Sequence, residues 1–200
     1  MKYYIDTEFI EAPNFIELIS IGIKCEDGRT FYAESISFNE RKACNWVKEN
    51  VISKLKWYGN PKSTMRRGIT RYHKQEKSTE VFGDNRLIAD AIREFINNGN
   101  GPPEFWGYYA DYDWVVFCWL FGSMMTLPET WPKYCKDLKQ LLDDLEVPLL
   151  PAPEGEHNAL VDAIWNEELH KYLLKRQERQ NKKIGIKNEK IWNQTDLLDF

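Results

Sequence analysis

The 200-residue sequence predicts an α/β fold in which α-helices flank a mixed central β-sheet. Three observations favour this class. Segments rich in β-branched and aromatic residues follow one another near the N-terminus, strand-like and helical segments then alternate along the chain, and the hydrophobic content of 42% is ordinary for a globular protein. The length suits one compact domain with a full hydrophobic core.

The first three predicted elements are strands. Residues 3–9, 15–24 and 29–35 have the composition of strands, and Glu26-Asp27-Gly28 is a turn signal between the second and the third. We therefore expect the chain to open with a β-meander.

Two helices are predicted in the next part of the chain. Residues 39–56 carry apolar side chains at helical spacing behind Asn39, a candidate N-cap, and residues 85–98 do the same until Gly99. The connection between them, residues 59–78, is polar and basic. Because it is long for a compact domain, we expect it to be either a functional flap or a partly disordered segment.

The second half of the chain continues the alternation of strands and helices. We expect a strand at 104–109, helices at 113–121, 137–145 and 159–179, and a proline-rich loop at 147–155. This assignment places Asp113 at a strand-to-helix junction.

Charge is sorted along the chain although the net charge is only −4. Residues 41–77 contain eleven Lys and Arg against two Glu, and residues 171–190 contain eight against two, which leaves the remainder strongly acidic. Either basic segment alone fits a solvated face, but the combination is expected where metal-binding carboxylates must coexist with a polyanionic substrate. We expect a folded domain over residues 1–175 and a basic, polar tail over residues 176–200.

The sequence carries no signal for membrane insertion or secretion. No apolar run approaches the roughly 18 residues that a bilayer-spanning helix needs, and the N-terminus lacks the features of a signal peptide. The cysteines are widely spaced without a C-x-x-C pair, which indicates reduced structural thiols: Cys25, Cys44, Cys118 and Cys135. We therefore predict a cytoplasmic protein with no membrane partner.

Two carboxylates interrupt the first predicted strand. Residues two apart in a strand point to the same face, so Asp6 and Glu8 would present their side chains together, where a divalent cation can bridge them. An unpaired carboxylate in an apolar strand is costly unless a metal ion or hydrogen bonds neutralise it. The same spacing recurs at Asp144 and Glu146. These residues are expected at the end of a helix, where water solvates carboxylates and no metal ion is needed.

A histidine and an aspartate near the C-terminal third are five residues apart. On one helix His157 and Asp162 would diverge, because five residues turn the helix by about 140°. They converge if His157 lies in the preceding loop, with Asn158 as the N-cap and Asp162 one turn into the helix. The prolines and glycine upstream favour that arrangement.

The ordered combination of these residues resembles the DEDD superfamily of 3′-5′ exonucleases, in the DEDDh branch that has a histidine in its third motif. The resemblance spans residues 2–174. Residues 6–8 match the D-x-E motif, and HNALVD at 157–162 matches H-x-A-x-x-D completely. In the second motif, YYADYD at 108–113 keeps the alanine, the aromatic residue and the final Asp of the usual H-N-A-x-F-D, but it replaces the leading His-Asn by two tyrosines.

The resemblance implies a ribonuclease-H-like fold and a two-metal-ion mechanism. Four carboxylates would hold two Mg²⁺ or Mn²⁺ ions, and His157 would accept a proton from the attacking water: the metal ligands are Asp6, Glu8, Asp113 and Asp162. Thr7, Phe9 and Tyr109 are the candidate substrate contacts beside these motifs. Phe9 fits a role in base stacking and a role in the core equally well.

Within the branch, the chain, with its sequence at residues 107–114, resembles small bacterial and phage 3′-5′ exoribonucleases. The implied substrate is single-stranded RNA or an RNA overhang, favoured over DNA, with phosphate contacts from the connection between Arg66 and Lys77 and with a homodimer as a possible assembly. Two alternatives stay open: a 3′-5′ exodeoxyribonuclease, and a catalytically inactive relative that only binds nucleic acid. A structural protein with carboxylates scattered for solubility is a third.

Overall fold

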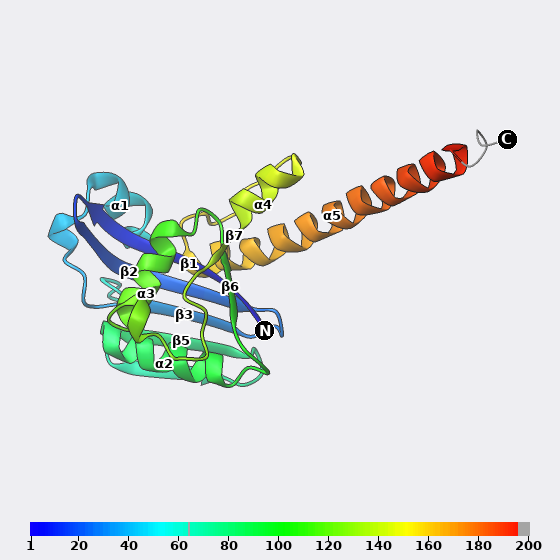
Figure 1. Cartoon of the computed structure of the whole chain (residues 1–200). Helices are drawn as coiled ribbons and strands as arrows, with labels where there is room; N and C mark the ends of the chain where they lie inside the picture. Colours follow the sequence, from blue (N-terminus) through cyan, green and yellow to red (C-terminus); the bar gives the residue numbers. More distant parts are fainter. Residues whose placement is uncertain (64, 196–200) are drawn as a thin grey trace.

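The computed structural model describes residues 1–63 and 65–195, with side chains described as far as residue 182. Within these residues one mixed sheet has the strand order β4-β5-β3-β2-β1-β6-β7 (Figure 1). The strands are β1 (Lys2–Ala12), β2 (Phe15–Cys25), β3 (Thr30–Ser35), β4 (Ile69–His73), β5 (Ser78–Gly83), β6 (Glu104–Gly107) and β7 (Lys136–Asp137). The α/β class with a mixed central sheet is confirmed, and it is consistent with a ribonuclease-H-like fold.

Helices cover both faces of the sheet. They are α1 (Asn45–Asn50), α2 (Asn85–Asn97), α3 (Asp111–Leu120), α4 (Leu138–Leu145) and α5 (Ala159–Thr195), with short 3-10 turns η1 (Glu40–Lys42), η2 (Ile52–Lys54) and η3 (Met124–Thr126). The main core joins Tyr3 and Ile5 of β1 to the buried sides of α2 and α3. Because side chains alternate along a strand, Tyr4 and Asp6 face the other way, toward α5.

The N-terminal meander is confirmed. β1 pairs antiparallel with β2, and β2 pairs antiparallel with β3. The turn before β3 contains Gly28 at a φ of 96°, a conformation that costs glycine little. A register shift between Glu8 and Phe9 marks a β-bulge, a feature that is common beside active sites.

The connection at residues 59–78, expected to be a functional flap or a partly disordered segment, contains an ordered strand in its second half. β4 pairs antiparallel with β5, and β5 pairs parallel with β3. Most β4 side chains are exposed, so the strand has no apolar alternation by which its sequence could reveal it. Backbone pairing at the sheet edge stabilises it instead.

The single helix expected at residues 39–56 is also wrong. The chain forms η1, α1 and η2 in succession, and the Asn39 side chain caps η1 by accepting a hydrogen bond from the Arg41 N–H. The breaks let Val51, Ile52 and Leu55 pack on Ile10 in one apolar cluster. Tertiary packing thus overrides the helical spacing of the apolar residues.

The remaining helices agree with expectation except in length. Asp84 caps α2, Asp137 caps α4, and α3 begins two residues before Asp113. Helix α5 continues past residue 179 to Thr195 and projects far beyond the sheet (Figure 1). The division into a domain at 1–175 and a tail at 176–200 stays a prediction, and residues 196–200 lie outside the described residues.

No helix among the described residues combines the length and the apolar character that crossing a lipid bilayer requires.

Candidate active site

The site lies where strands β1 and β6 part. These parallel strands pair only from Lys2 and Glu104 to Tyr4 and Trp106, and β1 then continues without a strand partner on that edge. On that edge, side chains replace the missing strand as hydrogen-bond partners of the β1 backbone. The Asn166 side-chain amide, for example, donates a hydrogen bond to the Ile5 carbonyl (3.0 Å). A crevice beyond the carboxyl ends of parallel strands is the usual place for a ligand in such sheets.

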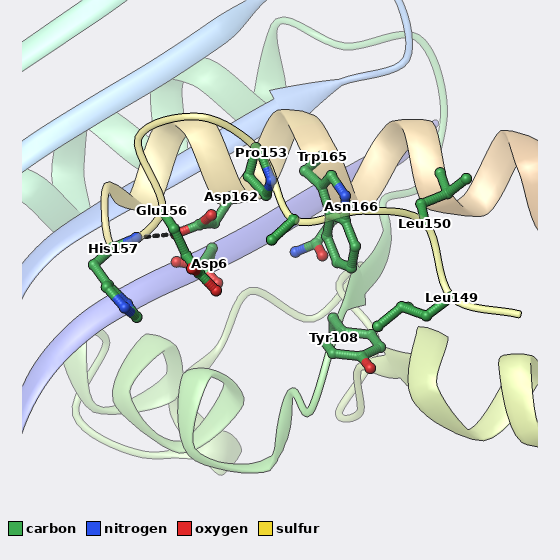
Figure 2. Close-up of a pocket in the computed structure, with 11 residues that line it drawn as sticks. Asp6, Tyr108, Leu149, Leu150, Pro153, Glu156, His157, Asp162, Trp165 and Asn166 are labelled. Atoms are coloured by element: carbon green, nitrogen blue, oxygen red, sulfur yellow. Dashed lines mark hydrogen bonds between the residues drawn. The ribbon is translucent and has the colours of Figure 1, made fainter.

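Three carboxylates converge in this crevice. Asp6 and Glu8 lie on one face of β1, and Asp162 lies in the first turn of α5. One carboxylate oxygen from each side chain lies within 4.8 Å of the others. Figure 2 shows the side chains of Asp6 and Asp162 pointing toward one another.

A glycine allows the helix to approach the strands so closely. Gly22 of β2 pairs with Asp6, and a Cβ atom at position 22 would lie only 2.1 Å from the Ala159 carbonyl oxygen. The Asn158 side chain caps the same turn by accepting hydrogen bonds from the Leu160 N–H (3.1 Å) and the Val161 N–H (3.2 Å). The first turn of α5 therefore rests directly on β2, with Asp162 over the crevice.

Asp113 reaches the crevice from the other face of the sheet. Its Oδ1 atom accepts hydrogen bonds from the Thr7 N–H (2.7 Å) and the Thr7 hydroxyl (2.5 Å), and the residue is only 7% exposed. Asp113 stands outside the group of three close carboxylates, but one cavity of about 450 Å³ is lined by all four together with His157.

Burial raises the pKa values of the site's carboxylates, and for Asp6 and Glu8 the neighbouring carboxylates raise them further. Burial raises the pKa of Glu8 to about 8, and the charges of Asp162 and Asp113 add to the shift. The pKa of Asp6 is raised well above its usual value by burial and by the neighbouring carboxylates, and burial raises that of Asp113 to about 6 against its bonds to Thr7. Cations would relieve this repulsion, and an all-oxygen donor set fits Mg²⁺ or Mn²⁺.

His157 lies in the loop before α5, as the sequence predicts. Its backbone has a φ of 68°, and its N–H donates a hydrogen bond to Asp162 Oδ2 (3.0 Å; dashed in Figure 2). Its ring packs against the exposed Trp46 of α1, with ring centroids 4.8 Å apart. The sequence does not reveal that Trp46 belongs to the site, because a lone tryptophan on a short helix gives no sign that it lies beside a distant histidine.

The three candidate substrate contacts differ in their surroundings. Thr7 is only 6% exposed, and its hydroxyl is bonded to Asp113. Phe9 is half-buried against Tyr112 and lines the cavity, whereas Tyr109 is 62% exposed at the cavity wall. Tyr109 has a φ of 55°, a strained conformation that is frequent at functional sites.

A smaller apolar cavity of about 200 Å³ adjoins the acidic one and shares His157 and Asp162 with it. Leu149, Leu150 and Pro153 of the proline-rich loop form one wall, and Trp165 of α5 forms another (Figure 2). The Trp165 indole N–H donates to the carbonyl of Pro151 (2.8 Å), which ties the loop to the helix. The sequence predicts only a proline-rich loop in this segment and gives no sign of the apolar cavity.

Comparisons with known proteins agree on one family. A family model described as the 3′-5′ exoribonuclease Rv2179c-like domain matches residues 1–174. Two curated proteins from Mycobacterium tuberculosis, of strains H37Rv and CDC 1551, are each named a 3′-5′ exoribonuclease. Each is 35% identical to this chain over 176 residues, which cover 87% of this chain and 92% of the relative.

Proposed function

Because this chain belongs to the Rv2179c-like family of 3′-5′ exoribonucleases, we propose that it removes nucleotides hydrolytically from the 3′ end of single-stranded RNA or of RNA overhangs. The observation that carries the proposal is the convergence of Asp6, Glu8 and Asp162 at the mouth of a crevice, with carboxylate oxygens within 4.8 Å of one another. Either protonation or a bound cation relieves such repulsion, and the cluster of oxygen ligands around an open cavity suits a cation.

We propose that two divalent ions, Mg²⁺ or Mn²⁺, occupy the acidic cavity, held by Asp6, Glu8, Asp162 and Asp113. Such ions, when bound, promote deprotonation of the attacking water and stabilise charge on the leaving 3′-oxygen. Thr7 fixes Asp113 through one oxygen, Oδ1, which leaves Oδ2 for coordination.

His157 is proposed as the general base. A neutral imidazole nitrogen of its ring accepts the proton of the attacking water, and the backbone bond to Asp162 Oδ2 holds the loop that carries the ring beside the carboxylates. Replacing His157 by Asn should therefore lower turnover strongly and leave metal binding largely intact.

The 3′ end is proposed to enter the acidic cavity between Phe9 and Tyr109. Both rings line the cavity, and aromatic faces stack on bases of any identity. We propose RNA over DNA as the substrate, a homodimer in solution, and the cytoplasm as the location. The cysteines are free thiols, which fits a reducing compartment.

The test is digestion of 5′-labelled single-stranded RNA and single-stranded DNA with Mg²⁺ or Mn²⁺. We expect a ladder of progressively shorter labelled RNA, slower loss of DNA, and no activity in Asp6→Asn. Asp144→Asn, which changes the other D-x-E pair at the end of α4, is the matched control and should act like the parent. Equal activity of Asp6→Asn and the parent would eliminate the mechanism, and immediate release of the labelled nucleotide would eliminate the polarity.

A further inference from the structure

Strands β4 and β5 form a basic hairpin, and the sheet register places its two ends at different distances from the candidate active site. A row of paired residues crosses the sheet from Glu8 through Ser20, Glu34 and Phe82 to Ile69. We call the three close carboxylates Asp6, Glu8 and Asp162 the acidic cluster. Ile69 lies level with Glu8 of this cluster, and the four strand spacings of about 4.8 Å between them add up to about 19 Å.

The other end of the hairpin lies level with a different part of β1. His73 pairs with Ser78, and the row continues through Thr30 and Lys24 to Tyr4. Tyr4 precedes Glu8 by four residues, which is about 14 Å along the strand. The turn that carries Lys74 and Lys77 is thus remote from the acidic cluster in both directions.

The segment before β4 is fixed over the α5 face of the sheet. Trp57 and Met65 are buried with Tyr32 and Phe82, and Leu160 in the first turn of α5 packs against the same cluster. This apolar cluster connects the segment to the turn that carries Asp162.

The buried carboxylate of Glu34, on the sheet, also holds this segment through hydrogen bonds. The Glu34 side chain accepts hydrogen bonds from the backbone N–H groups of Trp57 (2.9 Å) and Tyr58 (2.8 Å) and also from that of Lys56. Glu34 itself is fully buried, so these bonds are shielded from water. The loop that follows is therefore anchored to the sheet at the level of the acidic cluster.

Two arginines stand on this anchored segment. Arg66 and Arg67 are exposed and line a shallow depression of about 410 Å³ together with Trp57, Asn60 and Met65. Among the described residues, neither guanidinium group has a carboxylate partner, whereas the nearby Lys56 is paired with Glu80. Their charge is thus available to a ligand.

We propose that Arg66 and Arg67 bind phosphates of the RNA strand upstream of the nucleotide that is being removed. The inference rests on the proposed function. The carboxylates of the acidic cavity repel the phosphates of an RNA strand, and positive groups on the same face offset this repulsion while the 3′ end enters the cavity. At a stacked rise of about 3.4 Å per nucleotide, the separation of about 19 Å between Glu8 and Ile69, which follows Arg67 by two residues, corresponds to about six nucleotides, and a dinucleotide does not span it.

The test compares long and short substrates with the full-length protein. Steady-state kinetics are measured on an RNA dinucleotide and on single-stranded RNA of about 16 nucleotides. Arg66→Ala/Arg67→Ala should raise KM for the long RNA about tenfold. It should also lower the slope of log KM against log salt concentration by about 1.4, because each phosphate contact to a single strand contributes about 0.7 to that slope. Its kcat and its rate on the dinucleotide should equal those of the parent.

Two further variants serve as controls. Arg66→Lys/Arg67→Lys keeps the positive charges and should retain most of the affinity for long RNA. Lys74→Ala/Lys77→Ala removes the same charge from the opposite end of the hairpin, which the sheet register places away from the acidic cluster, so it should raise KM for long RNA less than the arginine-to-alanine variant does.

Three results would overturn the proposal: an unchanged KM for long RNA in the arginine-to-alanine variant, an equal rise in the Lys74 and Lys77 variant, or a parallel loss on the dinucleotide. If the parent hydrolyses neither substrate, the proposed function fails separately. Fluorescence anisotropy with labelled RNA then decides the inference on its own, because the dissociation constant should rise about tenfold only when both arginines become alanine.

Discussion

Thr7→Val removes one hydrogen bond from the candidate site and changes almost nothing else. Valine has nearly the shape of threonine, and the residue is almost fully buried in β1, so the strand should persist. The backbone N–H bond to Asp113 Oδ1 (2.7 Å) remains, and the hydroxyl bond to the same oxygen (2.5 Å) is lost. Asp113 then keeps its place through a single hydrogen bond.

The size of the effect follows from the charge on Asp113. A hydrogen bond to a charged group contributes roughly 1.5–3 kcal/mol, and about 1.4 kcal/mol corresponds to a factor of ten. Loss of a bond that orients a metal ligand typically costs 10–100-fold in metal affinity or activity. We therefore expect the Mg²⁺ concentration for half-maximal rate to rise about 10–100-fold in Thr7→Val.

The assay is a Mg²⁺ titration of the initial rate on labelled single-stranded RNA at saturating substrate. Thr7→Ser keeps the hydroxyl and should titrate close to the parent, and KM for RNA at saturating Mg²⁺ should be unchanged in both variants. The opposite pattern, a raised KM for RNA with an unchanged Mg²⁺ requirement, would show that the Thr7 hydroxyl contacts substrate and would refute its role in holding Asp113.

Three further predictions concern the same cleft. Trp46→Ala should lower kcat about tenfold because the His157 ring loses its packing partner, and Trp46→Phe should restore most of it; equal kcat in all three proteins would exclude a positioning role. Because the pKa values of Asp113 and Glu8 are raised to about 6 and about 8, Mg²⁺ must displace protons, so its affinity should increase from about pH 6 to about pH 8 and then level off. Calorimetry in buffers of different ionisation enthalpy measures the released protons, and a pH-independent affinity would contradict this. Gly22→Ala should destabilise the fold by about 3 kcal/mol in urea unfolding and weaken Mg²⁺ binding, because the new Cβ collides with the first turn of α5; a neutral result would mean that the helix can shift without cost.

Local rules predicted the parts of the site that depend on neighbours in sequence. Asp6 and Glu8 share a face because a strand alternates its side chains, and the loop position of His157 follows from the prolines and glycine before it. Asn158 has a side-chain oxygen that can accept hydrogen bonds from free N–H groups at a helix start, and it caps α5. Each of these needed only a short window of sequence.

Tertiary contacts decided what the sequence could not reveal. The edge strand β4 is polar, because its stability comes from backbone pairing with β5 rather than from burial of its side chains. The Glu34 carboxylate is fully buried because three backbone N–H groups of a segment distant in sequence donate hydrogen bonds to it, and no local pattern reveals this. Trp46 meets His157 only after the chain has folded.

The Asp6, Glu8 and Asp162 contact also sets the moment at which the protein can first act. During synthesis, β1 leaves the ribosome long before α5, and contacts between residues so far apart in sequence form late. Until the first turn of α5 rests on Gly22, the crevice lacks Asp162 and the loop that carries His157. A nascent chain therefore has no complete site until the first turn of α5 has been synthesised and has packed on β2.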